Sequence, residues 1–308
     1  MKEKVVVFGG SGFLGSHVSD YLTKSGYNVV IFDIKKSQYL KEGQEMVIGD
    51  ILDNKLVNDT IKGSKYVYHF AGIADIKEAQ EKPTEAIKTN ILSMAYILES
   101  CLKHKIDRLV YSSTIYVYST YGSFYRSTKQ AAELLIENYF ESFGLNYTIL
   151  RYGSLYGPRA NSFNLINRVI ISALKKGKIV RGGNGEELRE YIHVLDAAKA
   201  SVKILSDQYL SSNILITGSK AMRIKEFFNM LNEIFDNKLK IDYTDKETND
   251  RHYNITPYTF KPKVARRYQL DGHIDLGQGI LDQIHTVYQK LLISGEVNEN
   301  NQFTMKDG

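Results

Sequence analysis

Short apolar runs rich in valine, isoleucine and tyrosine alternate with helix-forming segments along the first half of the chain. The expected strands are residues 4–8, 28–32, 45–48, 66–70, 107–112 and 146–151, and the expected helices are residues 13–25, 53–61, 83–104 and 127–143. This alternation is typical of a doubly wound parallel sheet, in which right-handed crossovers place ligands at the carboxyl ends of the strands. The sequence therefore predicts a Rossmann-type α/β fold.

After Tyr152 this alternation is interrupted. A loop-rich insert with one helix over residues 163–176 comes first, followed by an expected helix at 195–205, a strand at 213–217, and helices at 224–235 and 276–290. We therefore expect two domains and a polar tail. The first domain comprises residues 1–152 and is rejoined by about 186–217, a smaller α/β substrate-binding lobe comprises 153–185 and 218–295, and the tail is 296–308.

Composition excludes several classes of protein. The 308-residue chain has a net charge of +5 without a basic block, which gives little support to nucleic-acid binding and suits a small anionic substrate. The single cysteine, Cys101, excludes a disulfide framework or a thiolate metal site, and no metal is expected. Because no signal peptide or membrane-spanning stretch is recognisable, we expect a cytoplasmic protein without membrane insertion.

A glycine-rich loop lies between the first expected strand and helix. Gly9, Gly12 and Gly15 have the G-x-x-G-x-x-G spacing, which permits a tight turn and lets backbone N–H groups approach a pyrophosphate. Asp33 ends the next strand, where a carboxylate accepts hydrogen bonds from an adenosine ribose. The alternative is a purely structural glycine turn, but the strand–loop–helix–strand–Asp order favours a dinucleotide. Asp33 would repel a 2′-phosphate, so NAD is expected rather than NADP, although Lys35 and Lys36 weaken this preference.

Tyr125 and Lys129 form a Tyr-x-x-x-Lys pair at the start of the helix expected over 127–143. A spacing of four places both side chains on one helix face. A nearby ammonium favours the phenolate of a tyrosine whose pKa is otherwise about 10, so Tyr125 could act as a base. The alternative is an ordinary surface pair.

These motifs resemble the extended short-chain dehydrogenase/reductase family, and within it the NAD-dependent nucleotide-sugar epimerases and dehydratases. The stretch 112–118 is similar to the family's S-S-[ST]-x-x-V-Y-G, with Thr114 at the hydroxyl that orients the substrate oxygen. Ile115 and Tyr116 stand where the family's 4,6-dehydratases carry Asp-Glu, which argues against dehydration.

The resemblance extends over most of the chain and implies further site residues. Cofactor contacts are implied for Phe13, Leu14, Ile34, Asp50, Ile51, Phe70, Ala71, Gly72, Asn90, Ser112 and Tyr152, besides the glycines, Asp33, Tyr125 and Lys129. Substrate contacts are implied for Thr114, Ser154, Arg159, Arg189 and Arg251, with Arg189 on the diphosphate. An ordinary solvated pair of Arg189 with Glu190 is the alternative, and the segment around Arg251 could equally be a plain loop.

Two departures from the family pattern concern substrate choice. Ser154 replaces the usual asparagine, and only six residues separate Tyr118 from Tyr125, where relatives usually carry a long loop that lines the sugar pocket. The family also implies a homodimer through helices 91–104 and 127–143. Their apolar residues, which sequence cannot divide between core and interface, are Ile91, Met94, Ala95, Leu98, Ala131, Leu134 and Leu135.

Three functions remain open from the sequence. The first is C4 epimerisation of a nucleotide-diphosphate sugar in bacterial surface polysaccharide synthesis, with Tyr125 as base. The second is net 4-dehydrogenation, because the short loop and residues 252–258 are similar to GDP-heptose 4-dehydrogenases of capsule clusters. The third is an NAD-binding regulator without turnover, against which the intact Thr114, Tyr125 and Lys129 argue.

Overall fold

The computed structural model describes residues 2–244, 266–267 and 272–297, and the chain divides into two compact units. The first unit comprises Met1–Gly153, Leu195–Ile216 and Pro257–Leu270, and the second comprises Ser154–Val194, Thr217–Thr256 and Asp271–Gly308. Within the described residues, no helix is long and apolar enough to cross a membrane.

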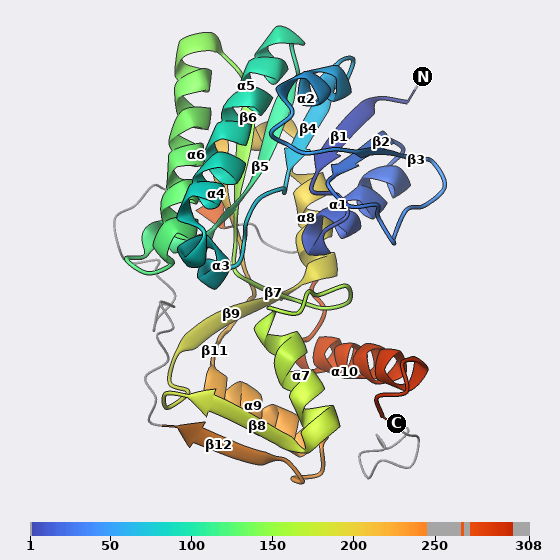
Figure 1. Cartoon of the computed structure of the whole chain (residues 1–308), viewed down its shortest axis with the longest axis vertical. Helices are drawn as coiled ribbons and strands as arrows, with labels where there is room; N and C mark the ends of the chain where they lie inside the picture. The colour runs from blue at the N-terminus through green and yellow to red at the C-terminus, as the bar shows by residue number, and fades with distance from the viewer. Residues whose placement is uncertain (1, 245–265, 268–271, 298–308) are drawn as a thin grey trace. The chain divides into compact units, whose positions relative to one another are not determined.

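The first unit contains a parallel sheet and the helices that cover it (Figure 1). Its elements are β1 (Lys4–Phe8), α1 (Phe13–Lys24), β2 (Asn28–Asp33), β3 (Gln44–Ile48), α2 (Asn54–Ile61), β4 (Tyr66–His69), α3 (Ile76–Glu81), α4 (Pro83–Ile87), the π-helical turn η1 (Lys88–Leu92), α5 (Ser93–Lys103), β5 (Arg108–Thr114), the 3-10 turn η2 (Ile115–Tyr118), α6 (Ser123–Phe143), β6 (Tyr147–Tyr152), α8 (Val194–Lys203), the 3-10 turn η3 (Asp207–Tyr209), β10 (Ser212–Ile216) and β13 (Arg266–Arg267). The strand order is β13-β10-β6-β5-β4-β1-β2-β3, and every pair is parallel.

The strand order reverses direction at β1. This strand pairs with β2 on one side and β4 on the other, so the crossovers diverge at the carboxyl ends of β1 and β4. In open α/β sheets such a switch point is where ligands bind. The predicted Rossmann-type fold is confirmed, because the sheet is parallel and both of its faces carry helices.

The central strands β1, β2, β4, β5 and β6 are buried on both faces, which explains why they read as nearly continuous apolar runs. On one face, alternate residues such as Val6 and Val30 pack against α2, α5 and α6, where Met94, Leu98 and Ile136 are fully buried. Figure 1 shows α1 and α8 on the opposite face, and Tyr68 of β4 donates a hydrogen bond to Ser201 O of α8 at 2.9 Å.

The structure resolves which apolar residues of α5 and α6 belong to the core. Met94 and Leu98 are completely buried inside the first unit and therefore are not available to a partner chain. Ala95, Ala131 and Leu135 are half-buried, as is Ile91 of η1, whereas Leu134 is 50% exposed.

Several element boundaries differ from the sequence prediction. Helix α6 begins at Ser123 rather than 127, after Gly122 in the left-handed region, so Tyr125 lies within its first turn. The helix expected over 83–104 is divided by the π-helical turn, and α3 precedes it. The segment 186–194, expected to return to the first domain, lies in the second unit because its strand pairs there.

The second unit is built on two small sheets. Its elements are β7 (Ser154–Tyr156), α7 (Leu165–Lys176), β8 (Lys178–Gly182), β9 (Leu188–His193), β11 (Ala221–Arg223), α9 (Ile224–Ile234), β12 (Lys240–Thr244) and α10 (Leu276–Ile293). The sheets have the orders β11-β9-β7 and β12-β8. A separate core joins α7, α9 and α10 around Ile170, Phe227, Phe228 and Ile284.

Arg108 connects two distant stretches of the first unit. Its guanidinium donates to Ile204 O at 2.8 Å and Ser206 O at 3.2 Å, just beyond the last turn of α8, and only 2% of the residue is exposed. The guanidinium therefore fixes the turn that follows α8 against β5. Asp207 also lies 3.5 Å from the guanidinium, but its side chain is 95% exposed.

We expect Arg108→Leu to lower the free energy of unfolding by about 2–4 kcal/mol, because it removes charge-assisted hydrogen bonds and takes the guanidinium partner from the buried carbonyl of Ile204. Urea denaturation followed by circular dichroism measures this change. Asp207→Ala is the matched control and should change stability by less than about 0.5 kcal/mol, because its ion pair is exposed to solvent. Equal losses in the two variants would contradict this account of Arg108.

Candidate active site

The glycine loop closes tightly between β1 and α1. Gly9 has φ of +79°, and a Cβ there would lie 2.5 Å from Ala71 N. A Cβ on Gly15 would lie 2.2 Å from Gly9 O, so only glycine lets the first turn of α1 approach the loop this closely. The cap residue, Gly12, supplies no side chain to the first N–H groups of α1. Free N–H groups at the start of a helix, with the helix dipole, favour an anion such as a pyrophosphate.

Asp33 is held at the edge of this loop. Its Oδ2 accepts from Ser11 N at 3.0 Å and its Oδ1 accepts from Lys35 N at 3.2 Å, while the Ser11 hydroxyl donates to Lys35 O at 2.9 Å. The carboxylate therefore has a fixed orientation at the carboxyl end of β2. Ser11 is not among the predicted site residues, although its position inside the Gly-Gly-Ser-Gly loop could have indicated it. The adjacent Ile34 is 63% exposed.

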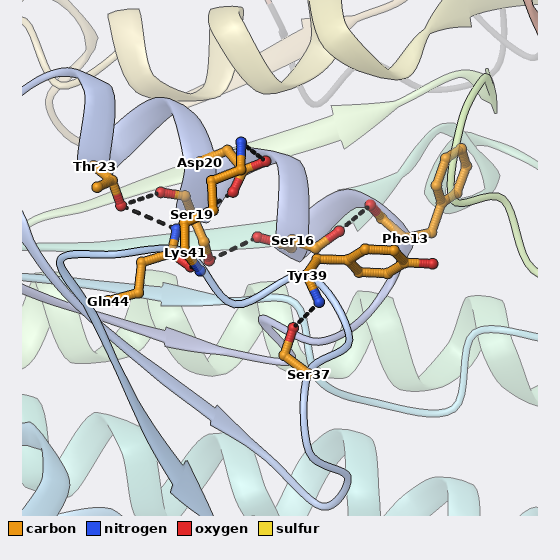
Figure 2. Close-up of polar contacts among 10 residues, drawn as sticks. Phe13, Ser16, Ser19, Asp20, Thr23, Ser37, Tyr39, Lys41 and Gln44 are labelled. Atoms are coloured by element: carbon orange, nitrogen blue, oxygen red, sulfur yellow. Dashed lines mark hydrogen bonds and ion pairs between the residues drawn. The ribbon is translucent and has the colours of Figure 1, made fainter.

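Polar contacts join α1 to Lys41, in the segment before β3, and to Gln44, the first residue of β3, as Figure 2 shows. Gln44 Nε2 donates to Thr23 Oγ1 at 3.0 Å and to Asp20 Oδ1 at 3.3 Å, and Lys41 Nζ lies 2.8 Å from Asp20 Oδ2. Ser37 Oγ accepts from Tyr39 N at 3.1 Å. These contacts restrain the chain that follows Asp33.

The loop after β4 is built on backbone contacts. Phe70 N and Ala71 N both donate to Phe8 O, at 2.8 and 3.1 Å, which places the predicted Phe70–Gly72 turn against the glycine loop.

The other predicted cofactor residues lie after β3 and at the start of α1. Asp50 is exposed and accepts from Leu52 N at 2.9 Å, whereas Ile51 is buried. Phe13 and Leu14 are the first two residues of α1.

Asn90 connects this loop to α6. It lies in the π-helical turn, where its Oδ1 accepts from Ile73 N at 2.8 Å and its Nδ2 donates to Ile73 O and Thr128 Oγ1, both at 3.0 Å. Gly72 leaves room for it, because a Cβ there would lie 2.6 Å from Asn90 Oδ1. Single π turns inside helices are frequent at functional sites. Asn90 is thus a brace between two segments of the site.

Tyr125, Lys129 and Ser112 come together at the carboxyl end of β5. Lys129 Nζ donates to Ser112 O at 2.8 Å and lies 5.9 Å from the centroid of the Tyr125 ring. Tyr125 is half-buried, while Lys129 is only 5% exposed. Thr114 is the last residue of β5, and its Oγ1 accepts from Tyr116 N at 3.3 Å.

Burial shifts the ionisation of the groups around Lys129. It lowers the pKa of Lys129 from 10.5 to about 8, against the opposing effect of Glu133, so the amine still carries a charge at neutral pH. Burial, assisted by the Lys129 charge, also lowers the pKa of His69 to about 3, so this imidazole is neutral. Lys129 thus places a positive charge beside the ring of Tyr125.

A buried ion pair lies one helical turn beyond Lys129. Arg151 Nε and Nη2 donate to the two carboxylate oxygens of Glu133 at 3.0 and 2.6 Å, and Ser113 Oγ donates to Glu133 Oε1 at 2.5 Å. Arg151 Nη1 donates to the Tyr118 hydroxyl at 2.5 Å. Glu133 was not predicted, although it continues the four-residue spacing of Tyr125 and Lys129.

Tyr152 points to the face of the sheet that carries α8. Its hydroxyl lies 2.6 Å from Ser201 Oγ, and burial raises its pKa. Its predicted proximity to the nicotinamide stays a prediction.

The predicted substrate residues Ser154, Arg159 and Arg189 belong to the second unit. Ser154 begins β7 and pairs with Tyr191 of β9. Arg159 has φ of +65°, and Arg189 of β9 is only 5% exposed, with Nη1 donating to Leu188 O at 2.9 Å. Arg189 is therefore buried rather than a solvated surface charge. Arg251 and the segment 252–258 lie outside the described residues. Within the described ranges, no group of three His, Cys, Asp or Glu side chains could hold a metal ion.

Residues 5–214 match the NAD dependent epimerase/dehydratase family. The chain is 30% identical to UDP-N-acetyl-alpha-D-glucosaminuronate decarboxylase of Bacillus cytotoxicus, with 92% of this chain and 97% of that protein covered. It is 28% identical to a putative UDP-glucose 4-epimerase of Methanocaldococcus jannaschii, over 90% and 95% of the two chains. The fold matches that of UDP-glucuronic acid 4-epimerase from Bacillus cereus, solved with UDP-glucuronic acid and NAD, with a TM-score of 0.82, 23% identity, and 93% and 99% of the chains covered.

We expect Asp33→Ala to raise the Kd for NAD by about 10–100-fold, because a hydrogen bond to a charged group contributes about 1.5–3 kcal/mol. The Kd for NADP should rise less, since the repulsion of a 2′-phosphate disappears with the carboxylate. Isothermal titration calorimetry measures both constants. Asp33→Asn is the matched control, because its amide oxygen can still accept from Ser11 N. A preference between NAD and NADP that is unchanged in both variants would refute the role of Asp33.

Proposed function

Because the chain belongs to the NAD dependent epimerase/dehydratase family, within the extended short-chain dehydrogenases/reductases, we propose that it oxidises the C4 hydroxyl of a nucleotide-diphosphate sugar with Tyr125 as the base. The observation that carries this proposal is the fixed arrangement of Tyr125, Lys129 and Ser112 at the carboxyl end of β5. Membership of the family makes the chain an NAD-dependent enzyme of the nucleotide-sugar epimerase/dehydratase group, so a regulator without turnover is set aside.

The first unit has the features that NAD requires. The glycine loop leaves space where a Cβ would clash, the first turn of α1 offers N–H groups to a pyrophosphate, and Asp33 presents a carboxylate at the end of β2. When bound, NAD accepts a hydride from the sugar carbon. The residues that would hold it are those of the glycine loop, Asp33 and the Phe70–Gly72 turn.

In the proposed reaction, Tyr125 takes the proton of the sugar hydroxyl as the C4–H bond breaks and the carbonyl forms. The Lys129 ammonium stabilises the phenolate that performs this step, and the backbone carbonyl of Ser112 fixes the ammonium. Thr114 would orient the sugar oxygen toward Tyr125. Asn90 braces the loop after β4 against α6, which keeps Tyr125 in place.

C4 epimerisation is the net reaction that we favour. The putative UDP-glucose 4-epimerase of Methanocaldococcus jannaschii aligns over most of both chains. Ile115 and Tyr116 carry no carboxylate that could protonate a leaving hydroxyl, which disfavours dehydration.

We further propose a homodimer through α5 and α6, supported by Leu134, Phe140 and Phe143 of α6, whose exposed fractions are 50%, 37% and 59%. A place in bacterial surface polysaccharide synthesis stays a prediction.

Net 4-dehydrogenation is the second candidate, favoured by the short connection between η2 and α6. Arg126 donates to Ser119 O at 3.0 Å and Gln130 to Val117 O at 2.9 Å, so this connection is held against α6 and does not extend into a long loop. A short connection suits a larger sugar such as a heptose.

Incubation with excess NAD and a panel of UDP-, GDP-, dTDP- and CDP-sugars, GDP-heptose included, separates these reactions. The near-ultraviolet band of reduced nicotinamide is recorded, and the sugar is analysed by NMR. A new C4 epimer without lasting NADH supports the epimerase, whereas stoichiometric NADH with a 4-keto sugar supports the dehydrogenase. A 6-deoxy-4-keto product would contradict both.

We expect Tyr125→Phe to lower kcat by about 10²–10⁴-fold, the usual contribution of a general base, while the Kd for NAD changes little. Steady-state kinetics and calorimetry measure the two quantities. Tyr121→Phe is the matched control, because Tyr121 lies in the connection just before α6 and is 42% exposed. Near-normal turnover in Tyr125→Phe would exclude Tyr125 as the base.

A further inference from the structure

Lys129 has an unusual environment for a charged amine. Only 5% of the residue is exposed, and its Nζ donates to a single backbone carbonyl within the described residues, that of Ser112 at 2.8 Å. The Nζ also lies 4.8 Å from the centroid of the Tyr111 ring, closer than its 5.9 Å from the Tyr125 ring. A desolvated ammonium with one hydrogen bond needs further stabilisation, and an aromatic face within about 6 Å provides it.

Tyr111 lies in β5, and only 1% of the residue is exposed. Its hydroxyl has no hydrogen-bond partner among the described residues, so the hydroxyl does not explain why a tyrosine occupies this position. Its ring contacts the ring of His69, with centroids 5.6 Å apart, and faces Lys129 Nζ. The aromatic face is thus the part of Tyr111 that bears on the site.

We propose that Tyr111 is a positioning residue, whose aromatic face holds the Lys129 ammonium beside Tyr125 and keeps it charged. The catalytic consequence rests on the proposed function, in which Tyr125 is the base. The contact between Tyr111 and Lys129 does not rest on the proposed function, because it concerns only the ionisation of Lys129.

The other groups around Lys129 do not replace this contact. Glu133, on the same helix, favours the ammonium, but both its carboxylate oxygens are already bound by Arg151. His69 of β4 is neutral at physiological pH and adds no negative charge. Tyr125 carries negative charge only as the phenolate, and the Tyr118 hydroxyl of η2 is bound to Arg151.

The test measures the pKa of Lys129 in the full chain without substrate. Lysine labelled with ¹³C and ¹⁵N gives one NMR titration curve per side chain, and the curve missing in Lys129→Met identifies Lys129. Burial lowers the pKa of Lys129 to about 8, so its titration is separated from that of ordinary lysines near 10.5. Tyr111→Phe removes only the hydroxyl, and 3,4,5-trifluorophenylalanine at position 111 keeps the shape of the ring while weakening its negative face.

We expect the pKa of Lys129 to remain within about 0.3 unit in Tyr111→Phe and to fall by about one unit with the fluorinated ring. Tyr111→Leu should lower it at least as far, but the smaller side chain leaves a cavity, so the fluorinated ring carries the test. The alkaline limb of kcat against pH should move to lower pH by the same amount, with KM nearly constant.

An unchanged pKa of Lys129 with the fluorinated ring would overturn the proposal. A fall in the pKa of Lys129 in Tyr111→Phe as large as that with the fluorinated ring would also overturn it, because the hydroxyl would then be responsible. A lowered pKa of Lys129 without any change in the pH profile of kcat supports the contact with Tyr111 and counts against the proposed function.

Discussion

The ion pair between Glu133 and Arg151 is the interaction on which the arrangement of the site depends. Both side chains are at most 1% exposed, and the pair joins α6 to β6, with Ser113 of β5 and Tyr118 of η2 bound to its two ends. Removing one partner of such a buried pair typically costs about 3–5 kcal/mol, because the other charge is left unpaired. Since Tyr125, Lys129 and Glu133 follow one another at four-residue intervals on α6, fixing Glu133 fixes the height and rotation of the helix beside β5.

A second set of contacts fixes the start of the same helix. Asn90, in the π-helical turn, binds both Thr128 and the backbone of Ile73. Gln130 and Arg126 bind the backbone of the connection from η2. Tyr125 therefore projects from a helix that is held at several points, which suits its proposed role as the base.

The fold of the first unit and the centre of the site could be predicted from the sequence. The central strands β1, β2, β4, β5 and β6 are buried on both faces and so read as apolar runs. Gly9 and Gly15 are required by close backbone contacts that no other residue permits. The pairing of Glu133 with Arg151 could not be predicted, because two charged residues 18 positions apart normally indicate exposed surface. The strands β7 and β9 were missed because their three and six residues follow no clear alternation.

The charge on Lys129 is maintained at the expense of stability. Its pKa is lowered from 10.5 to about 8 in the folded chain, so the unfolded chain binds the proton more tightly. Below pH 8 both states carry the charge, and the burial of the ammonium costs about 3–4 kcal/mol, as follows from about 1.4 kcal/mol per pKa unit. Between pH 8 and 10.5 the folded state releases the proton before the unfolded state does. The cost of burying the ammonium therefore disappears over this range, and the free energy of unfolding rises with pH. At neutral pH Lys129 is thus in its destabilising, charged form, which is the form that the proposed reaction needs to stabilise a phenolate at Tyr125. The contacts of Ser112 and Tyr111 with the ammonium, and the ion pair one turn away, limit this cost without removing the charge.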